Sequence, residues 1–190
     1  GWRTRSDTAS AGQVRGMHSW IANNSDRWIS AGSYNKLYVY SGAGIQYDIT
    51  PAGFTAGNED ALTPVGYGNS FYGLEYYGTP RQESVTITPA TTWSMDSWGQ
   101  YLVACSSTDG KVYEWQLSTG TIAAVVANAP VNNRAILVTE ERFLMCLGAG
   151  GNPRLVQWSD REDNTVWTPA ATNEAGSLEL QTTGRIQCGV

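Results

Sequence analysis

One short motif occurs three times in this chain and constrains its fold more than any other feature. The copies are "KLYVY" at residues 36–40, "KVYEW" at residues 111–115 and "RLVQW" at residues 154–158. Each copy consists of a cation, an aliphatic residue, two further residues and an aromatic residue. An apolar run and then a turn rich in Gly, Ser, Asn or Asp precede each copy. This order predicts three β-hairpins, with the motif as the second strand of each hairpin.

The stretches around the hairpins add further strands to each unit. "MHSWIAN", "TTWSMDS" and "NNRAILVTE" precede the three hairpins, and "GIQYDIT", "GTIAAVV" and "NTVWTPA" follow them. Arg154 follows Lys111 by 43 residues, and Lys111 follows Lys36 by 75 residues, which is close to two units. A looser copy, "GLEYYG" at residues 73–78, is a candidate for the unit between them. Four strands at a period of about 40 residues are typical of a β-propeller blade.

The sequence therefore predicts an all-β fold over residues 1–190, a β-propeller or propeller-like repeat of four-stranded antiparallel blades. An irregular β-sandwich with coincidental hairpins is the alternative. The chain begins at Gly1 and ends on "GRIQCGV", which reads as the first strand of a further blade, so we expect part of a larger protein. Residues 57–92 are rich in Gly, Pro and Thr, and we expect a long extended loop that serves assembly or attachment.

The composition argues against several classes of function. The formal net charge is −5 and the basic residues form no cluster, which does not suit a nucleic-acid-binding surface. No apolar run is long enough to span a membrane, so no membrane insertion is expected. The three cysteines are isolated, and we interpret them as buried free thiols. The chain contains 8 Trp and 10 Tyr against 3 Phe, which is typical of surfaces that are partly packed and partly hydrated.

No residue in the sequence qualifies as catalytic, cofactor-binding or metal-binding, so we expect neither enzyme activity nor a cofactor. "GAGGNP" at residues 148–153 has a proline in place of the third glycine of a dinucleotide loop and precedes a predicted strand, which favours a hairpin turn. His18 is the single histidine and lies in a predicted strand, which favours a structural role. Carboxylates are paired at residues 59–60, at residues 140–141 and within residues 160–163, but sequence spacing places no two of them in a cleft.

The stretch "WSDREDNTVWTPA" at residues 158–170 is the most distinctive local pattern. It loosely resembles the Asp-box turn of sialidase-type propellers in its residue types, although the spacing differs and the glycine is absent. Short polar side chains can bond to their own backbone and fix such a turn. The residues expected to do so are Ser159, Asp160, Asp163, Asn164 and Thr165.

Three tryptophans are predicted to anchor the packing of the strands: Trp115, Trp158 and Trp167. We expect Trp158 and Trp167 to pack on each other across the hairpin that contains them. If Trp158 belongs to the core, its replacement by alanine lowers stability by about 3–5 kcal/mol.

The amino-acid sequences of several longer stretches resemble those of one family of virus proteins. These stretches are residues 36–57 ("KLYVYSGAGIQYDITPAGFTAG"), residues 110–115 ("GKVYEW") and residues 128–186, which begin "NAPVNNRAILVTEERFLMCLG". They are similar to the tail nozzle, or tail tubular, and tail accessory proteins of short-tailed bacteriophages. The resemblance covers most of the chain, most strongly residues 93–190, and includes no catalytic motif.

The resemblance implies a tube of β-propeller and β-rich domains below the adaptor ring, which conducts the genome during ejection. The implied partners are copies of the chain in a ring of about six, the adaptor or portal-side tail protein, and tail fibre or tail-tip proteins. DNA is expected only in transit. The implied location is the virion tail, after assembly in the host cytoplasm.

Two other classes of function stay open on the sequence alone. One is a receptor- or glycan-binding propeller, with residues 159–164 and the loop at residues 57–92 as the binding edge. The other is a propeller enzyme that degrades surface polysaccharide, which needs two close carboxylates in a pocket. The net negative charge fits the tail interpretation, because a conduit with basic walls would retain the DNA that passes through it.

Overall fold

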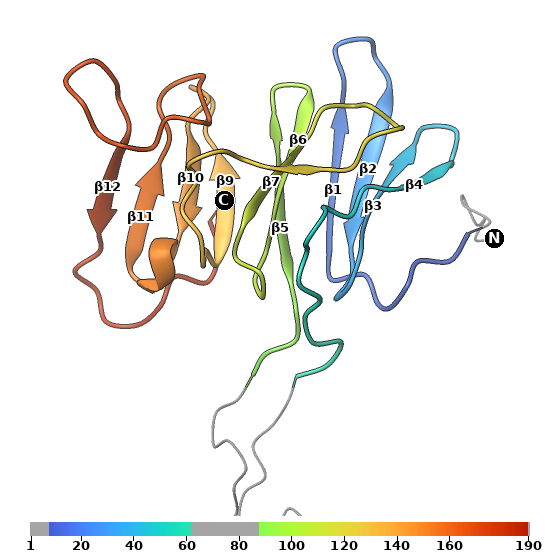
Figure 1. The fold of residues 1–190 in the computed structure, drawn as a ribbon, viewed down its shortest axis with the longest axis horizontal. Helices are drawn as coiled ribbons and strands as arrows, with labels where there is room; N and C mark the ends of the chain where they lie inside the picture. The colour runs from blue at the N-terminus through green and yellow to red at the C-terminus, as the bar shows by residue number, and fades with distance from the viewer. Residues whose placement is uncertain (1–7, 62–87, 190) are drawn as a thin grey trace, which may run out of the picture.

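The computed structural model describes residues 8–61 and 88–189, and in these residues the fold is all-β (Figure 1). Three antiparallel sheets of four strands each follow one another along the chain. Sheet 1 contains β1 (Gly16–Ile21), β2 (Arg27–Gly32), β3 (Leu37–Ser41) and β4 (Gln46–Asp48). Sheet 2 contains β5 (Trp93–Trp98), β6 (Tyr101–Ser106), β7 (Val112–Trp115) and β8 (Ala124–Val125). Sheet 3 contains β9 (Ala135–Val138), β10 (Leu144–Leu147), β11 (Leu155–Trp158) and β12 (Gly176–Glu179), with a 3-10 turn, η1 (Ala149–Gly151), between β10 and β11.

Each sheet is an up-and-down meander in which every strand pairs with the strand that follows it in sequence. The repeated motif supplies the third strand of all three sheets, and the apolar run before it supplies the second. The predictions of an all-β fold and of four-stranded antiparallel units are therefore confirmed. The local order of short strands and tight turns explains this result, because it favours pairing between neighbours in sequence.

Two predicted strands are wrong, and both belong to the C-terminal part of the chain. The fourth strand of sheet 3 is Gly176–Glu179 rather than "NTVWTPA", because the chain turns before Trp167 and places its ring in the core. Residues 184–189 form no strand, although the N–H of Ile186 donates to the carbonyl oxygen of Pro153 at 2.9 Å. The candidate unit at residues 73–78 lies outside the described residues.

The two described ends of the predicted loop at residues 57–92 are bonded to each other. The N–H of Thr91 donates to the carbonyl oxygen of Asn58 at 3.0 Å, and the N–H of Asn58 donates to Oγ1 of Thr91 at 2.9 Å. The Thr91 hydroxyl also lies 2.7 Å from the hydroxyl of Thr108, in the turn after β6. These bonds fix both ends of the loop beside sheet 2, while residues 62–87 of the loop lie outside the described part of the chain.

A glycine turn joins β10 to β11, as the pattern "GAGGNP" predicts. Gly148, Gly150 and Gly151 have φ angles of 67°, 64° and 80°, a region that favours glycine. The segment forms η1 and leads directly into β11, so it offers no helix N-terminus that could bind a phosphate. The interpretation of this stretch as a hairpin turn is confirmed.

Two hydrophobic clusters join the sheets face to face. In the first, sheet 1 packs against sheet 2, with Trp20, Trp28, Leu37 and Val39 against Trp93, Leu102, Tyr113 and Trp115. In the second, sheet 2 packs against sheet 3, with Trp98, Val103, Cys105 and Val112 against Ile136, Leu144, Cys146 and Trp167. Sheet 2 serves both clusters because successive side chains of a strand point to opposite faces.

The first strands of the three sheets, β1, β5 and β9, are neighbours, and the sheets fan out from them (Figure 1). Polar side chains of β5 bond to β9, the first strand of sheet 3. The Ser94 hydroxyl donates to the carbonyl oxygen of Ile136 at 2.8 Å, and the Asp96 carboxylate accepts from the N–H of Val138 at 2.8 Å. These bonds hold β5 and β9 together without a continuous ladder of backbone hydrogen bonds between the two sheets.

Candidate functional site

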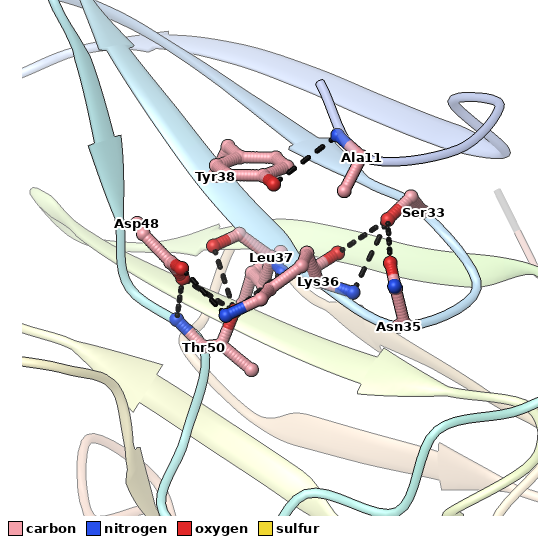
Figure 2. A network of polar contacts seen from close by, with 8 residues as sticks. All are labelled: Ala11, Ser33, Asn35, Lys36, Leu37, Tyr38, Asp48 and Thr50. Carbon is pink, nitrogen blue, oxygen red and sulfur yellow. Dashed lines mark hydrogen bonds and ion pairs between the residues drawn. The ribbon is translucent and has the colours of Figure 1, made fainter. Parts of the chain in front are cut away.

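The cations that open the first and third motifs connect the third strand of a sheet to its fourth strand. Nζ of Lys36 lies 2.8 Å from Oδ2 of Asp48, the last residue of β4 (Figure 2). Arg154 forms the equivalent ion pair with Glu179, the last residue of β12. The cation in the motif therefore has a structural task, which is to restrain the end of the edge strand.

The Lys36 ion pair belongs to a small network at the start of β3 (Figure 2). The Thr50 hydroxyl donates to Asp48, and its oxygen accepts from the N–H of Leu37 at 3.0 Å. Partial burial alone would raise the pKa of Asp48, but the hydrogen bonds from Lys36 and Thr50 outweigh it and hold this pKa below its ordinary value. The hydrogen bond to Asp48 raises the pKa of Lys36. Because exposed ion pairs add little stability, we interpret this network as a positional restraint.

The second motif uses a different acid, because β8 consists of alanine and valine and supplies none. Lys111 lies 3.6 Å from Asp109, whose side chain is buried in the preceding turn. Asp109 also accepts from the N–H of Thr55 at 3.1 Å and from the Tyr113 hydroxyl at 3.0 Å. Burial, together with the bond to Asp109, raises the pKa of Tyr113. Asp109 therefore ties the chain that leads into the loop to the β6–β7 turn.

The aromatic residues that close the motifs do not all point in the same direction. Trp115 is 1% exposed and lies in the cluster between sheets 1 and 2. In sheet 3, Gln157 is opposite Cys146, and the side chain of Cys146 lies in the cluster with sheet 2. The neighbouring Trp158 must then point to the other face of sheet 3. Relative to the second motif, the third motif is therefore shifted by one residue along its strand. Such a shift moves every side chain to the opposite face of the sheet.

Trp158 consequently lies half-buried on the outer face of sheet 3, by which we mean the face turned away from sheet 2. Its Nε1 donates to the carbonyl oxygen of Glu174 at 2.8 Å, and its ring lies so close to Gly176 that an added Cβ there would be 2.5 Å from it. Trp167 is 3% exposed and packs on the opposite side, in the cluster with sheet 2. The expected packing of the Trp158 and Trp167 rings on each other is therefore wrong.

The residues predicted to fix the turn after β11 do form one local network. The Ser159 hydroxyl donates to the carbonyl oxygen of Asp160 at 2.9 Å, and the Asp160 carboxylate accepts from the N–H of Glu174 at 2.8 Å. Asp163 accepts from the N–H and the hydroxyl of Thr165 at 2.9 and 2.6 Å. The hydrogen bond from the Thr165 hydroxyl lowers the pKa of Asp163. These bonds are of the local kind that short polar side chains favour.

Asn164 joins this turn to sheet 2 across a surface groove. Its side-chain amide donates to Oε2 of Glu114 in β7, and its backbone carbonyl oxygen accepts from Nε1 of Trp167 at 2.7 Å. The groove beside this junction has a volume of about 440 Å³. Its lining includes polar groups of Glu114, Gln116, Asn164 and Thr165 and apolar side chains of Ile122 and Val125. The groove therefore contains two residues singled out from the sequence, Asn164 and Thr165.

His18 lies between the inner strands of sheets 1 and 2. Its ring stacks on Trp20 with 6.0 Å between the centroids, and its Nε2 lies 2.8 Å from Oγ of Ser97. The carboxylate of Asp96 accepts from the backbone N–H groups of Ser97 and Val138 at 2.8 Å each. These contacts support the structural interpretation of His18, because they hold it and its neighbours between β1, β5 and β9.

The burial of His18 predicts a loss of stability in mild acid. Burial lowers the pKa of His18 below its ordinary value of 6.5, although the charge of Asp96 opposes this effect. The unfolded chain therefore binds more protons than the folded chain just below pH 6.5, so the free energy of unfolding is expected to fall as the pH drops through that region. Urea unfolding at about pH 7.5 and about pH 5.5 measures the fall. The variant His18→Gln should show a smaller decrease in the free energy of unfolding between these pH values. An equal decrease in the variant would contradict the assignment of this effect to His18.

Two of the three cysteines are buried thiols, as the sequence predicts, and one is not. Cys105 and Cys146 lie in the cluster between sheets 2 and 3. Burial raises the pKa of Cys105 to about 12 and also raises the pKa of Cys146. Both thiols are therefore protonated and unreactive at neutral pH. Cys188 is exposed, so the interpretation as a buried thiol is wrong for this residue.

The sheets at the two ends of the fan each carry apolar side chains on their outer faces. The outer face of sheet 1 is likewise the face turned away from sheet 2. On this face, the side chains of Met17 and Ile21 in β1 are 67% and 62% exposed. On sheet 3, Leu178 of β12 is 58% exposed. Single exposed apolar residues are ordinary on a protein surface, but several on one sheet face indicate a contact surface.

No family model, curated protein or solved structure matches this chain. In residues 8–61 and 88–189, no group of three or more His, Cys, Asp or Glu side chains could hold a metal ion. The same residues contain no helix of the length and hydropathy needed to cross a membrane. The function is therefore inferred from the geometry of the sheets, their faces and the groove.

Proposed function

We propose that this chain is a structural component of a bacteriophage tail, built from propeller blades and assembled through its sheet faces. The observation that carries the proposal is the pair of apolar outer faces on sheets 1 and 3. Within the chain, sheet faces with this composition are buried between neighbouring sheets. Two further faces of the same kind at the ends of the fan suit contacts with further sheets of this kind or with other chains.

A β-propeller is the architecture that these sheets suit best. Propeller blades are four-stranded antiparallel sheets arranged radially around a central channel. Sheets 1, 2 and 3 have four strands in simple order, their first strands are neighbours, and hydrophobic clusters join consecutive faces. In this proposal each sheet is one blade, and residues 57–92 are an insertion between the first and second blades.

The assignment to a phage tail comes from the resemblance of residues 36–57 and 93–190 to tail nozzle and tail accessory proteins. The proposal includes a ring of about six copies, contacts with the adaptor and with tail fibre or tail-tip proteins, and a location in the virion. The net charge of −5 supports a conduit, because an acidic wall does not retain DNA. A strongly positive channel in the assembled tail would contradict the conduit role.

Imaging of purified phage particles tests the proposed function. Particles that carry the chain with an affinity label should bind the label at the tail, and averaged images should show a ring of about six copies. Mass spectrometry of the same particles gives the copy number relative to the major capsid protein. A chain that is absent from the particles would overturn the proposal.

The groove between sheet 2 and the turn at residues 159–165 favours a second candidate, a receptor- or glycan-binding module. Carboxylate and amide groups beside apolar side chains are the usual lining of a small ligand site. In this case Glu114→Gln should weaken binding on a glycan array at least tenfold, because a charged acceptor is lost. An array without any bound glycan would remove this candidate.

The groove gives less support to a polysaccharide-degrading enzyme. Hydrolysis of a glycosidic bond normally uses two carboxyl groups, one on each side of the bond. Glu114 is the single carboxylate among the described residues that line the groove, and it already accepts from Gln116 at 2.7 Å and from Asn164. The chemistry in this groove therefore suits binding better than cleavage.

A further inference from the structure

We propose that the groove beside Asn164 binds the ammonium group of an amino sugar through the carboxylate of Glu114. The inference rests on the second candidate function, the glycan-binding module, and names the class of sugar that the groove takes. It does not depend on the assignment to a phage tail. Four features of the groove support it, and they are its charge, its hydrogen-bond acceptors, its apolar surface and its fixed wall.

Within the described residues, sheet 2 has no ion pair between its third and fourth strands, whereas sheets 1 and 3 each have one. Those two ion pairs are Lys36 with Asp48 and Arg154 with Glu179. In sheet 2 the third strand, β7, contributes Glu114, and the residue opposite it on β8 is Ala124. None of the ion pairs among the described residues includes Glu114. Its negative charge is therefore left for a partner from outside.

The lining of the groove does not balance the charge of Glu114. None of the described residues that line it is Lys, Arg or His. Oε1 of Glu114 accepts from the side-chain amide of Gln116 at 2.7 Å, and Oε2 accepts from that of Asn164. These amides hold both carboxylate oxygens in place but carry no net charge. Because opposite charges attract more strongly beside a protein surface than in bulk water, the carboxylate favours a cationic group of a ligand.

Two hydroxyl groups add hydrogen-bond acceptors to the groove. The Thr121 hydroxyl donates to the carbonyl oxygen of Ser118 at 3.0 Å, and the Thr165 hydroxyl donates to Asp163 at 2.6 Å. Each hydroxyl proton is thus used within the chain, which leaves the two oxygens as acceptors for a ligand. The groove therefore suits a ligand with many N–H and O–H donors.

The apolar surface and the volume of the groove favour a sugar ring as the carrier of the ammonium group. Ile122 and Val125 line the groove and are 51% and 52% exposed, so they can cover the C–H groups of a ring. The volume of about 440 Å³ is in the range of small-molecule sites. An amino sugar donates through its ammonium and hydroxyl groups and can place its C–H groups on these apolar side chains.

The wall that contains Asn164 is fixed by hydrogen bonds within the chain. Asn164 is 8% exposed, and its backbone carbonyl oxygen accepts from Nε1 of Trp167 at 2.7 Å. The side-chain amide of Asn128, which follows β8, donates to the carbonyl oxygen of Thr165 at 3.0 Å. The turn is thus bonded both to the core between sheets 2 and 3 and to the segment after sheet 2. A site fixed in this way loses less conformational entropy when a ligand binds.

Nuclear magnetic resonance of the isotope-labelled chain, titrated with three small probes, tests the proposal. Glucosamine carries the ammonium group, N-acetylglucosamine has the same ring without that charge, and Nα-acetyllysine amide carries an ammonium group without a ring. Glucosamine should shift the side-chain amide signals of Gln116 and Asn164, because both amides donate to Glu114. It should also bind at least tenfold more tightly than either of the other probes, since only glucosamine offers both the charge and the ring.

Two variants of the groove test the role of the carboxylate. Glu114→Gln removes the charge, and Ala124→Lys places an ammonium group of the chain itself opposite Glu114. Each should weaken the binding of glucosamine at least tenfold. Ala124 is exposed, so its replacement should leave the far-ultraviolet circular dichroism unchanged. Glu141→Gln is the matched control, because Glu141 is an exposed carboxylate outside the groove and its loss should not alter binding.

Three results would overturn the proposal. They are the absence of these shifts with glucosamine, equal binding of either other probe, and full binding by either groove variant. Equal binding of N-acetylglucosamine would still leave a glycan-binding groove, whereas the absence of any bound sugar, in solution and on the glycan array, would remove both ideas. Absence of the chain from phage particles would refute the tail function and leave these titrations as a separate result.

Discussion

Replacement of Trp115 by alanine is expected to lower the free energy of unfolding by about 3–5 kcal/mol. The ring lies between sheets 1 and 2, with ring centroids 6.4 Å from Trp20 and 5.2 Å from Trp28, edge to face in both cases. Its Nε1 donates to the carbonyl oxygens of Ser118 and Thr121 at 3.1 and 3.2 Å. Alanine would therefore leave a cavity between the sheets and two acceptors without their donor. Urea unfolding followed by circular dichroism measures the loss.

Trp158→Ala is the matched control for this prediction, because Trp158 closes the third motif as Trp115 closes the second. The half-buried ring on the outer face of sheet 3 should contribute less, about 1–2 kcal/mol. Equal losses for the two variants would contradict the reversed orientation of the third motif. If Trp115→Ala does not fold, Trp115→Phe keeps most of the apolar volume and should still lose more than Trp158→Phe.

Replacement of Trp167 by alanine is expected to have an effect of the same size, about 3–5 kcal/mol. The ring fills the cluster between sheets 2 and 3, and its Nε1 donates to the carbonyl oxygen of Asn164 at 2.7 Å. Loss of the ring therefore removes both core packing and the bond that holds the turn at residues 159–165. The same urea titration measures the loss in the free energy of unfolding.

Trp167→Phe separates these two contributions. Phenylalanine keeps an aromatic ring in the cluster but cannot donate to Asn164, so the loss should be about 1–3 kcal/mol. Thr168→Ala is a control in the same segment, since Thr168 is exposed and should change the stability by less than about 0.5 kcal/mol. A Trp167→Ala variant as stable as the wild type would show that this ring does not join sheets 2 and 3.

The hairpins were predictable because their signals are local. Asp109 and Gly110 mark the β6–β7 turn, and Gly110 has a φ of 67°, which the sequence suggests through the residue type alone. The cation of each motif was visible in the sequence, but its acidic partner was not. Asp48 and Glu179 lie at the ends of fourth strands, and a short fourth strand has too few residues to be recognised before its sheet is known.

The turn at residues 159–165 was predictable in its members but only partly in its role. Ser159, Asp160, Asp163 and Thr165 bond within the turn, as their side chains favour. The hydrogen bond from Asn164 to Glu114 joins residues that are 50 positions apart, and no local sequence pattern predicts it. The groove at this junction is therefore a product of how sheets 2 and 3 pack.

By itself the sequence determined that the chain forms short antiparallel strands in units of four, because turn residues and alternating side chains act between neighbours in sequence. Only the tertiary structure decided which face of each strand is buried. Trp115 and Trp158 end the same motif, yet Trp115 points into a core and Trp158 points away from one. The physical reason is the two-residue period of a strand: a shift of one position leaves the motif unchanged and exchanges the two faces of the sheet.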